Sequence, residues 1–133
     1  MCIRDSHPSE HKACEWQAAA NGMVGLESAL RVVHESMVET GLLSWTDVAR
    51  VLSTAPARIG SLSGHGTPVT VGQPAEFTLY DASARTPFTE ASLRGRSLNS
   101  PYLGRELPGS VEWTVHRGYA TLAEGAVVEG INA

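Results

Sequence analysis

The hydrophobic periodicity of this sequence changes at Gly60, and that change constrains the fold more than any other feature. Before it, between residues 26 and 37, apolar side chains recur at spacings of four, three and four. This pattern predicts a helix with one apolar face, formed by Leu26, Leu30, Val33 and Met37. Gly41 then supplies a stop signal for that helix.

A second helix is predicted to begin at Ser44. A serine is a good N-cap, and Asp47 places an acid three residues later, as in a capping box. Three apolar residues follow on one face: Val48, Val51 and Leu52. A third helix is expected to start at Thr54, with Pro56 close behind it. Short helices with apolar stripes need a larger surface to pack against.

Beyond Gly60, apolar residues alternate with polar ones, which is the period of strands. Short strands are expected at 69–71, 77–80, 111–115 and 119–122, the second of them ending at Asp81. Residues 97–109 are too rich in Pro, Gly and Asn for regular structure. So few strands do not close a sheet convincingly alone. Both halves therefore look like parts of something larger, and a small self-contained α+β domain is the alternative.

Composition narrows the function classes. The chain has 133 residues, enough for one domain, and its net charge of −4 provides no basic stripe for nucleic acid. No apolar run approaches the roughly 20 residues that cross a bilayer, and no apolar signal segment follows Met1. A soluble, cytoplasmic protein without membrane or nucleic-acid partners is expected. Cys2 and Cys14 are expected to be free thiols.

The stretch DSHPSEHKACEW, residues 5 to 16, is rich in metal-ligand residue types. On a helix, His7 and His11 would share a face, as would His11 and Cys14. Three ligands without a fourth make an incomplete structural zinc site, so no metal site is predicted here and a free-standing zinc module is the less favoured hypothesis.

The remaining polar and aromatic side chains receive structural interpretations. Glu10, Lys12 and Glu15 are expected on a solvated loop face, and His34, His65 and His116 on the surface. The three tryptophans, Trp16, Trp45 and Trp113, are expected to fill contacts to the helices and strands.

Three segments together carry a family resemblance. Residues 57–60 (ARIG) followed by 71–81 (VGQPAEFTLYD) resemble the junction between the barrel and the small β domain of amidohydrolases, with Glu76 where Asp is usual. Residues 97–109 (SLNSPYLGRELPG) resemble a loop of dihydroorotases and related cyclic amidohydrolases, with Leu98 in place of Lys. Residues 14–16 (CEW) and 22–27 (GMVGLE) are similar to the stretch after the eighth barrel strand of type I dihydroorotases.

The resemblance implies an α/β fold that is the C-terminal piece of a larger protein. The family fold is a (β/α)8 barrel of about 250 residues with a small β-sandwich domain, and this chain is too short to hold it. Residues 7–60 would be the last barrel loop and the closing helices, and residues 61–125 the C-terminal strands of the β-sandwich. Residues 1–6 are expected to be non-native sequence, and 126–133 a frayed tail.

The resemblance also implies an activity. Dihydroorotases reversibly hydrolyse the ring amide of dihydroorotate to carbamoyl-aspartate in pyrimidine biosynthesis, using zinc held by barrel residues. His7, Asn21 and Gly22 match family positions that bind the substrate, His7 through the substrate's carboxylate. The zinc ligands of the parent are expected upstream, in the missing N-terminal part of the same chain, so no metal and no catalytic residue is predicted here.

The family's catalytic aspartate lies four residues before the histidine matched by His7, where this chain has Ile3. Asp5 fits that role only if two residues were deleted. The 133-residue chain alone is therefore expected to be inactive. The alternatives are a non-catalytic subunit that supports aspartate carbamoyltransferase, or a sister enzyme such as allantoinase or dihydropyrimidinase. A homodimer or an association with aspartate carbamoyltransferase is the expected assembly of the parent.

Overall fold

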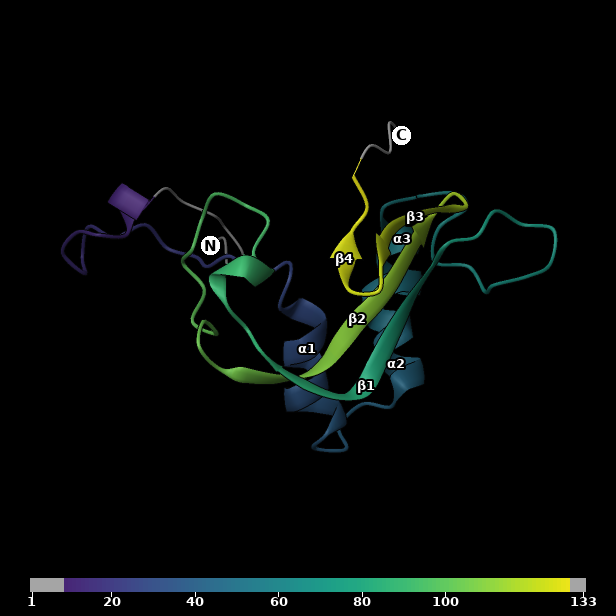
Figure 1. Ribbon diagram of the computed structural model, residues 1–133, viewed down its shortest axis with the longest axis horizontal. Helices are drawn as coiled ribbons and strands as arrows, with labels where there is room; N and C mark the ends of the chain where they lie inside the picture. Colours follow the sequence, from purple (N-terminus) through teal and green to yellow (C-terminus); the bar gives the residue numbers. More distant parts are fainter. Residues whose placement is uncertain (1–8, 130–133) are drawn as a thin grey trace.

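The computed structural model describes residues 9–129, in which helical segments lie against one face of a four-stranded antiparallel sheet (Figure 1). The strands follow one another in chain order, β1-β2-β3-β4. A short turn of helix, η1 (Ser9–His11), precedes a long irregular loop. No helix within residues 9–129 is both long and apolar enough to cross a membrane.

The first helical stretch consists of α1 (Ala29–Val33) and, without a break, the wider turn η2 (His34–Val38). It ends before Gly41, which has a φ of +75°, so the predicted helix and its stop are confirmed. The predicted apolar stripe is not the face that packs on the sheet, however. The buried side chains are Ser28, Arg31 and His34, whereas Leu26 is 74% exposed and Met37 is 39% exposed. The prediction of a surface position for His34 is wrong for the same reason.

The second stretch runs through α2 (Trp45–Ala49), η3 (Arg50–Thr54) and α3 (Ala55–Ile59). The predicted capping box is confirmed: Ser44 Oγ accepts from the Asp47 N–H at 3.2 Å, and the Asp47 carboxylate accepts from the Ser44 N–H at 3.1 Å. The predicted third start is confirmed, since α3 begins at Ala55 with Thr54 as its N-cap and Pro56 in the first turn, but the backbone of Thr54 is itself helical and no connection separates the segments. The wider η3 turn, in which the N–H of Ala55 bonds Arg50 O, brings the chain to Pro56 without a break.

The sheet is longer than predicted. Strand β1 spans Phe77–Pro87, β2 Glu106–His116, β3 Tyr119–Ala123 and β4 Ala126–Val127. The predicted strand cores at 77–80, 111–115 and 119–122 are confirmed. No strand forms at 69–71, residues 106–109 are regular despite their Pro and Gly, and the expected tail contributes β4 at its start.

Strand β1 continues beyond Asp81 because the residues between Asp81 and Arg85 form a bulge, after which the pairing with β2 resumes. The Asp81 carboxylate accepts from the N–H and the hydroxyl of Ser83, at 2.8 and 2.7 Å. These bonds lower the pKa of Asp81. The pairing with β2 shifts register between Asp81 and Arg85 and then resumes to Pro87 opposite Glu106.

The apolar core is small and lies at one end of the sheet. Four buried side chains form it: Val24, Phe88, Leu93 and Leu107. Leu93 follows the short helical turn η4 (Glu90–Ser92), and Tyr102 and Leu103 pack against the cluster from the next loop. The core therefore anchors the loops around residues 22–25 and 97–105.

Polar side chains join the first helix to the sheet. Arg31 donates to the carbonyl oxygens of Thr86 and Leu107, and to that of Pro108 at 3.2 Å. Tyr80 donates to Pro108 O at 3.0 Å, so the Nδ1 of His34, 3.0 Å from the Tyr80 oxygen, is the donor of that bond. Burial raises the pKa of the Tyr80 hydroxyl, which keeps it protonated for this role.

Two of the three tryptophans pack against other side chains, and the third is exposed. Trp45 packs on His34 and Tyr80, with ring centroids 4.8 and 5.5 Å away, and Trp113 pairs with Leu79 in the sheet. The predicted structural role fits these two. Trp16 is 93% exposed, so it makes no such packing contact within the described residues.

Candidate functional site

The loop between η1 and α1 is closed by its own hydrogen bonds. The N–H of Ala20 bonds His11 O at 3.1 Å, and those of Ala18 and Ala19 bond Glu15 O at 2.9 and 3.0 Å. These bonds return the chain to its starting point, so that residues 11–12 lie beside residues 20–22.

Gly22 lies at the centre of this arrangement. Its φ of +102° belongs to the region that glycine adopts without strain. Its carbonyl oxygen accepts from Lys12 Nζ at 2.6 Å and from Asn99 Nδ2 at 3.2 Å. Lys12 Nζ also donates to Ala20 O. Within residues 9–129 the main-chain N–H groups of Asn21 and Gly22 form no hydrogen bond.

Asn99 reaches Gly22 from the loop between η4 and β2, which the sequence analysis associated with a family motif. Ser97 is buried, and its hydroxyl donates to Asn99 Oδ1 at 2.7 Å. That bond turns the amide nitrogen of Asn99 toward Gly22. Tyr102 of the same loop packs on the core and lies under the Arg105 guanidinium, 5.5 Å from the ring centroid.

The structure brings together only part of the predicted site. Asn21 is exposed and Gly22 is half-buried in one turn. His7 lies outside the described residues, as do Cys2, Ile3 and Asp5. Lys12 and Asn99 were missed. The expectation of a solvated loop face is wrong for the Lys12 ammonium, which donates to two carbonyls.

The metal-ligand residue types of the first loop do not converge. Cys14 is an exposed free thiol, as predicted, and its Sγ contacts the His11 carbonyl at 3.6 Å. Across residues 9–129, no group of three or more His, Cys, Asp or Glu side chains is arranged to hold a metal ion.

A second polar cluster lies where the loop before β1 meets the turn between β2 and β3. Glu76 lies 3.1 Å from His116 Nδ1 and 3.6 Å from His65 Nδ1, and accepts from the Arg117 N–H at 2.9 Å. The two imidazole rings stack with centroids 5.9 Å apart. Both histidines are therefore partners of one carboxylate, and their side chains remain 36% and 40% exposed, in keeping with the predicted surface positions.

Several opposing effects act on this carboxylate. Burial raises the pKa of Glu76, but the Arg117 N–H, the bond to His116 and the charges of His116 and His65 outweigh it and lower the pKa. The cluster joins the loop before β1 to the turn between β2 and β3.

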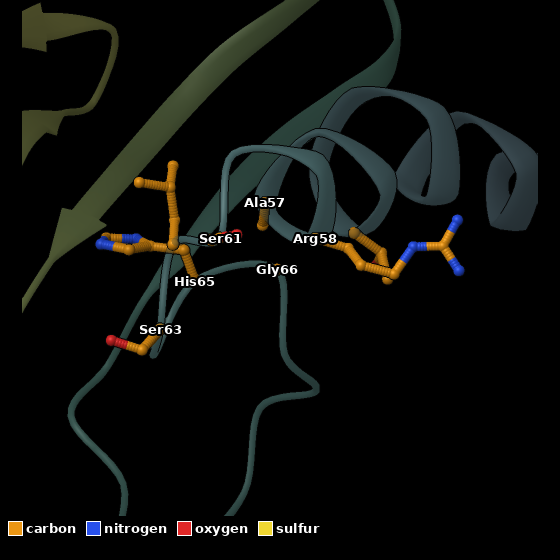
Figure 2. A pocket seen from close by; sticks show the side chains of 8 residues that line it. Ala57, Arg58, Ser61, Ser63, His65 and Gly66 are labelled. Atoms are coloured by element: carbon orange, nitrogen blue, oxygen red, sulfur yellow. The ribbon is translucent and has the colours of Figure 1, made fainter.

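A shallow cleft of about 310 Å³ lies between the end of α3 and residues 61–66. Figure 2 shows that Arg58 and His65, two chemically active side chains at its rim, point in opposite directions. They therefore do not form a combined binding site, and the Gly22 turn is the better candidate.

No protein-family model matches the chain. It is 60% identical over 125 residues to the dihydroorotase of Leifsonia xyli subsp. xyli, and 57% identical over 119 residues to that of Streptomyces coelicolor. These matches cover 94% and 90% of this chain but 28% of each relative.

Two solved structures share the fold. L-hydantoinase (dihydropyrimidinase) from Arthrobacter aurescens has a TM-score of 0.80 at 29% identity, over 92% of this chain and 28% of its own. A D-hydantoinase has a TM-score of 0.76 at 26% identity, over 91% of this chain and 26% of its own.

The mixed α/β fold with its four-stranded sheet is that of the C-terminal part of the cyclic amidohydrolases, which confirms the predicted fold class. Within that class, the sequence belongs to the dihydroorotase family, as the motifs had indicated. The chain spans just over a quarter of the length of the curated relatives it matches.

Proposed function

We propose that this chain serves as the C-terminal part of a dihydroorotase, and that it supplies a main-chain turn that binds the substrate's carboxylate. The complete enzyme would reversibly hydrolyse the ring amide of dihydroorotate to carbamoyl-aspartate. The observation that carries the proposal is the Asn21–Gly22 turn, whose N–H groups have no partner within residues 9–129 while the Gly22 carbonyl is held by two side chains.

Adjacent main-chain N–H groups that are not used by the fold suit an anionic oxygen ligand. Both dihydroorotate and carbamoyl-aspartate carry a carboxylate, and the glycine lets the ligand approach the backbone closely. His7, which the resemblance assigns to the same carboxylate, would complete the contact from the start of the loop. The roles of His7, Asn21 and Gly22 are thus one proposal.

The family is generally metal-dependent, and we propose that zinc is the metal of the parent. The described residues do not fit that role, because none of their ligand-type side chains form a group that could hold the ion. The ligands are therefore assigned to the rest of the enzyme, and the part of this chain in the reaction is to bind and orient the substrate.

The rest of the enzyme would also cover an apolar groove in this chain. The groove, of about 770 Å³, runs between the helices and the sheet. Leu26 and Leu52 line it and remain 74% and 43% exposed. Exposed apolar surface of this kind marks a contact site, and the preceding part of a dihydroorotase is the occupant we propose.

The proposal is tested by joining residues 7–133 of this chain to the preceding part of the Leifsonia xyli dihydroorotase, which then supplies the aspartate position that Ile3 occupies here. The chimera should hydrolyse dihydroorotate, and substitution of the upstream zinc ligands should abolish that activity. Hydrolysis of hydantoin or dihydrouracil in preference to dihydroorotate would overturn the assignment in favour of a sister enzyme. A folded but inactive chimera would favour the non-catalytic subunit.

A further inference from the structure

One carbonyl oxygen, that of Gly22, receives side-chain donors from two distant parts of the sequence. Lys12 lies ten residues away and Asn99 seventy-seven, yet their nitrogens are 2.6 and 3.2 Å from it. Figure 1 shows the N-terminal loop and the segment before β2 on the same side of the molecule. Nothing in the family resemblance assigned a role to either side chain.

The Lys12 ammonium holds two peptide groups at once, because it bonds the carbonyls of Ala20 and Gly22. In a planar trans peptide the C=O and the N–H point in opposite directions. The bond to Ala20 O therefore turns the N–H of Asn21 away from Lys12. In the same way, the bonds to Gly22 O set the direction of the next N–H, that of Met23.

Asn99 adds a fixed point from the folded core. Its Oδ1 accepts from the buried Ser97 hydroxyl, which leaves its Nδ2 directed at Gly22 O. The loop that carries it packs on the core through Tyr102 and Leu103. The first loop is thus tied to the apolar core at the glycine itself.

We propose that Lys12 and Asn99 are positioning residues for the substrate carboxylate: Lys12 sets the direction of the Asn21 N–H through Ala20 O, and both side chains fix the position of Gly22 through its carbonyl oxygen. The inference rests on the proposed function of that turn. Lys12 does not contact the carboxylate in this arrangement, because its ammonium lies on the carbonyl side of the peptide that presents the Asn21 N–H.

The test uses the active chimera described above, with steady-state kinetics for dihydroorotate and for carbamoyl-aspartate. Lys12→Met removes the donor and keeps the stem, and Asn99→Asp removes the donor with little change in volume. Each should raise KM about tenfold while kcat changes much less, as expected when binding in ground and transition state is lost alike. Lys12→Arg, which retains donors and charge, should restore most of the affinity.

Because both side chains act on one carbonyl, the double variant should raise KM by less than the product of the single effects. Gln17→Ala, an exposed change in the same loop, is the matched control and should leave KM unchanged. If Lys12→Met fails to fold, Asn99→Asp provides the same readout.

The outcomes separate the two proposals. An active chimera in which Lys12→Met and Asn99→Asp keep the parental KM, or in which kcat and melting temperature fall and KM does not rise, overturns the positioning role alone. A chimera that hydrolyses no dihydroorotate overturns the function on which it rests.

Discussion

A buried guanidinium joins the first helix to the sheet, and its removal leaves polar backbone groups without partners. Arg31 serves three carbonyls of β1 and β2, and the side chain is 9% exposed. Arg31→Met should destabilise the fold by about 3 kcal/mol, because hydrogen bonds to a charged group are lost and buried acceptors remain.

Denaturant unfolding of the chimera measures this effect. Arg50→Met is the matched control, since Arg50 is exposed and, among residues 9–129, its side chain pairs only with Asp47 at 3.3 Å, a contact worth less than about 1 kcal/mol. Equal losses for the two variants would contradict the structural role of Arg31.

Gly109 occupies a position where no side chain fits. Its φ is +77°, and a Cβ would lie 1.7 Å from the Tyr80 hydroxyl. Gly104 has a similar φ of +79° with nothing within 4 Å. Gly104→Ala should cost about 1 kcal/mol of backbone strain, and Gly109→Ala at least about 2 kcal/mol more from the clash. Melting curves that shift equally for the two alanines would rule out a close Tyr80 contact.

The structural role of a residue could be predicted when its hydrogen-bond partner lies nearby in the sequence. The Ser44–Asp47 capping box was found because both partners lie within four residues. Lys12 and Asn99 were missed, since the carbonyl they share becomes their neighbour only when the loop closes and the core forms. Gly22 was identified through a family motif, but the sequence did not predict its positive φ angle.

At the scale of elements, periodicity located the helices and strand cores but not their orientation or ends. Periodicity predicted the apolar stripe of the first helix. The face that contacts the sheet is instead that of Arg31 and His34, because those side chains reach carbonyls and the Tyr80 hydroxyl. Strand β1 extends beyond its predicted end at Asp81. The Asp81 carboxylate accepts a hydrogen bond from the Ser83 N–H at a bulge, after which the pairing with β2 continues.

The link between the loop before β1 and the β2–β3 turn depends on the charge of Glu76. Its folded pKa is lowered, so the stabilising contribution is present above the unfolded value of about 4.3 and is lost as pH falls through the folded pKa. Glu76→Gln should therefore flatten the decline in melting temperature between about pH 5 and pH 3. At neutral pH the variant should melt below the parent.

Two-dimensional NMR of the chimera locates this effect, because the Arg117 amide, which donates to Glu76 at 2.9 Å, should titrate with the carboxylate. Glu15→Gln, at an exposed position in the first loop, is the control and should keep the parental acid slope. An unchanged acid slope in Glu76→Gln would show that the carboxylate does not couple the two segments.

At the scale of the whole molecule, the chain has a larger solvent-accessible area than a folded monomeric domain of the same mass. Its accessible area is 9403 Å², whereas a folded monomer of 14.1 kDa exposes roughly 6,700 Å² by the usual scaling with mass. The excess agrees with a core cluster of four buried apolar side chains among residues 9–129 and an open groove along the helices.

This imbalance predicts that the isolated chain is marginally stable and gains stability from the preceding part of a dihydroorotase. Alone, it should unfold with an enthalpy well below the roughly 0.7 kcal/mol per residue of ordinary domains. Calorimetry of the chain with the separately produced N-terminal part of the Leifsonia xyli enzyme should show a higher melting temperature, as expected for a partner that binds only the folded form.

The rise in melting temperature should depend on contacts at the groove between the helices and the sheet. Leu26→Glu and Leu52→Glu place charges on its walls and should abolish the rise in melting temperature. Val71→Glu is the matched control, because Val71 is fully exposed and lies outside the groove, so the rise should persist. A cooperative, full-enthalpy transition of the chain alone, unaffected by the partner, would mean that the exposed leucines do not form a docking surface.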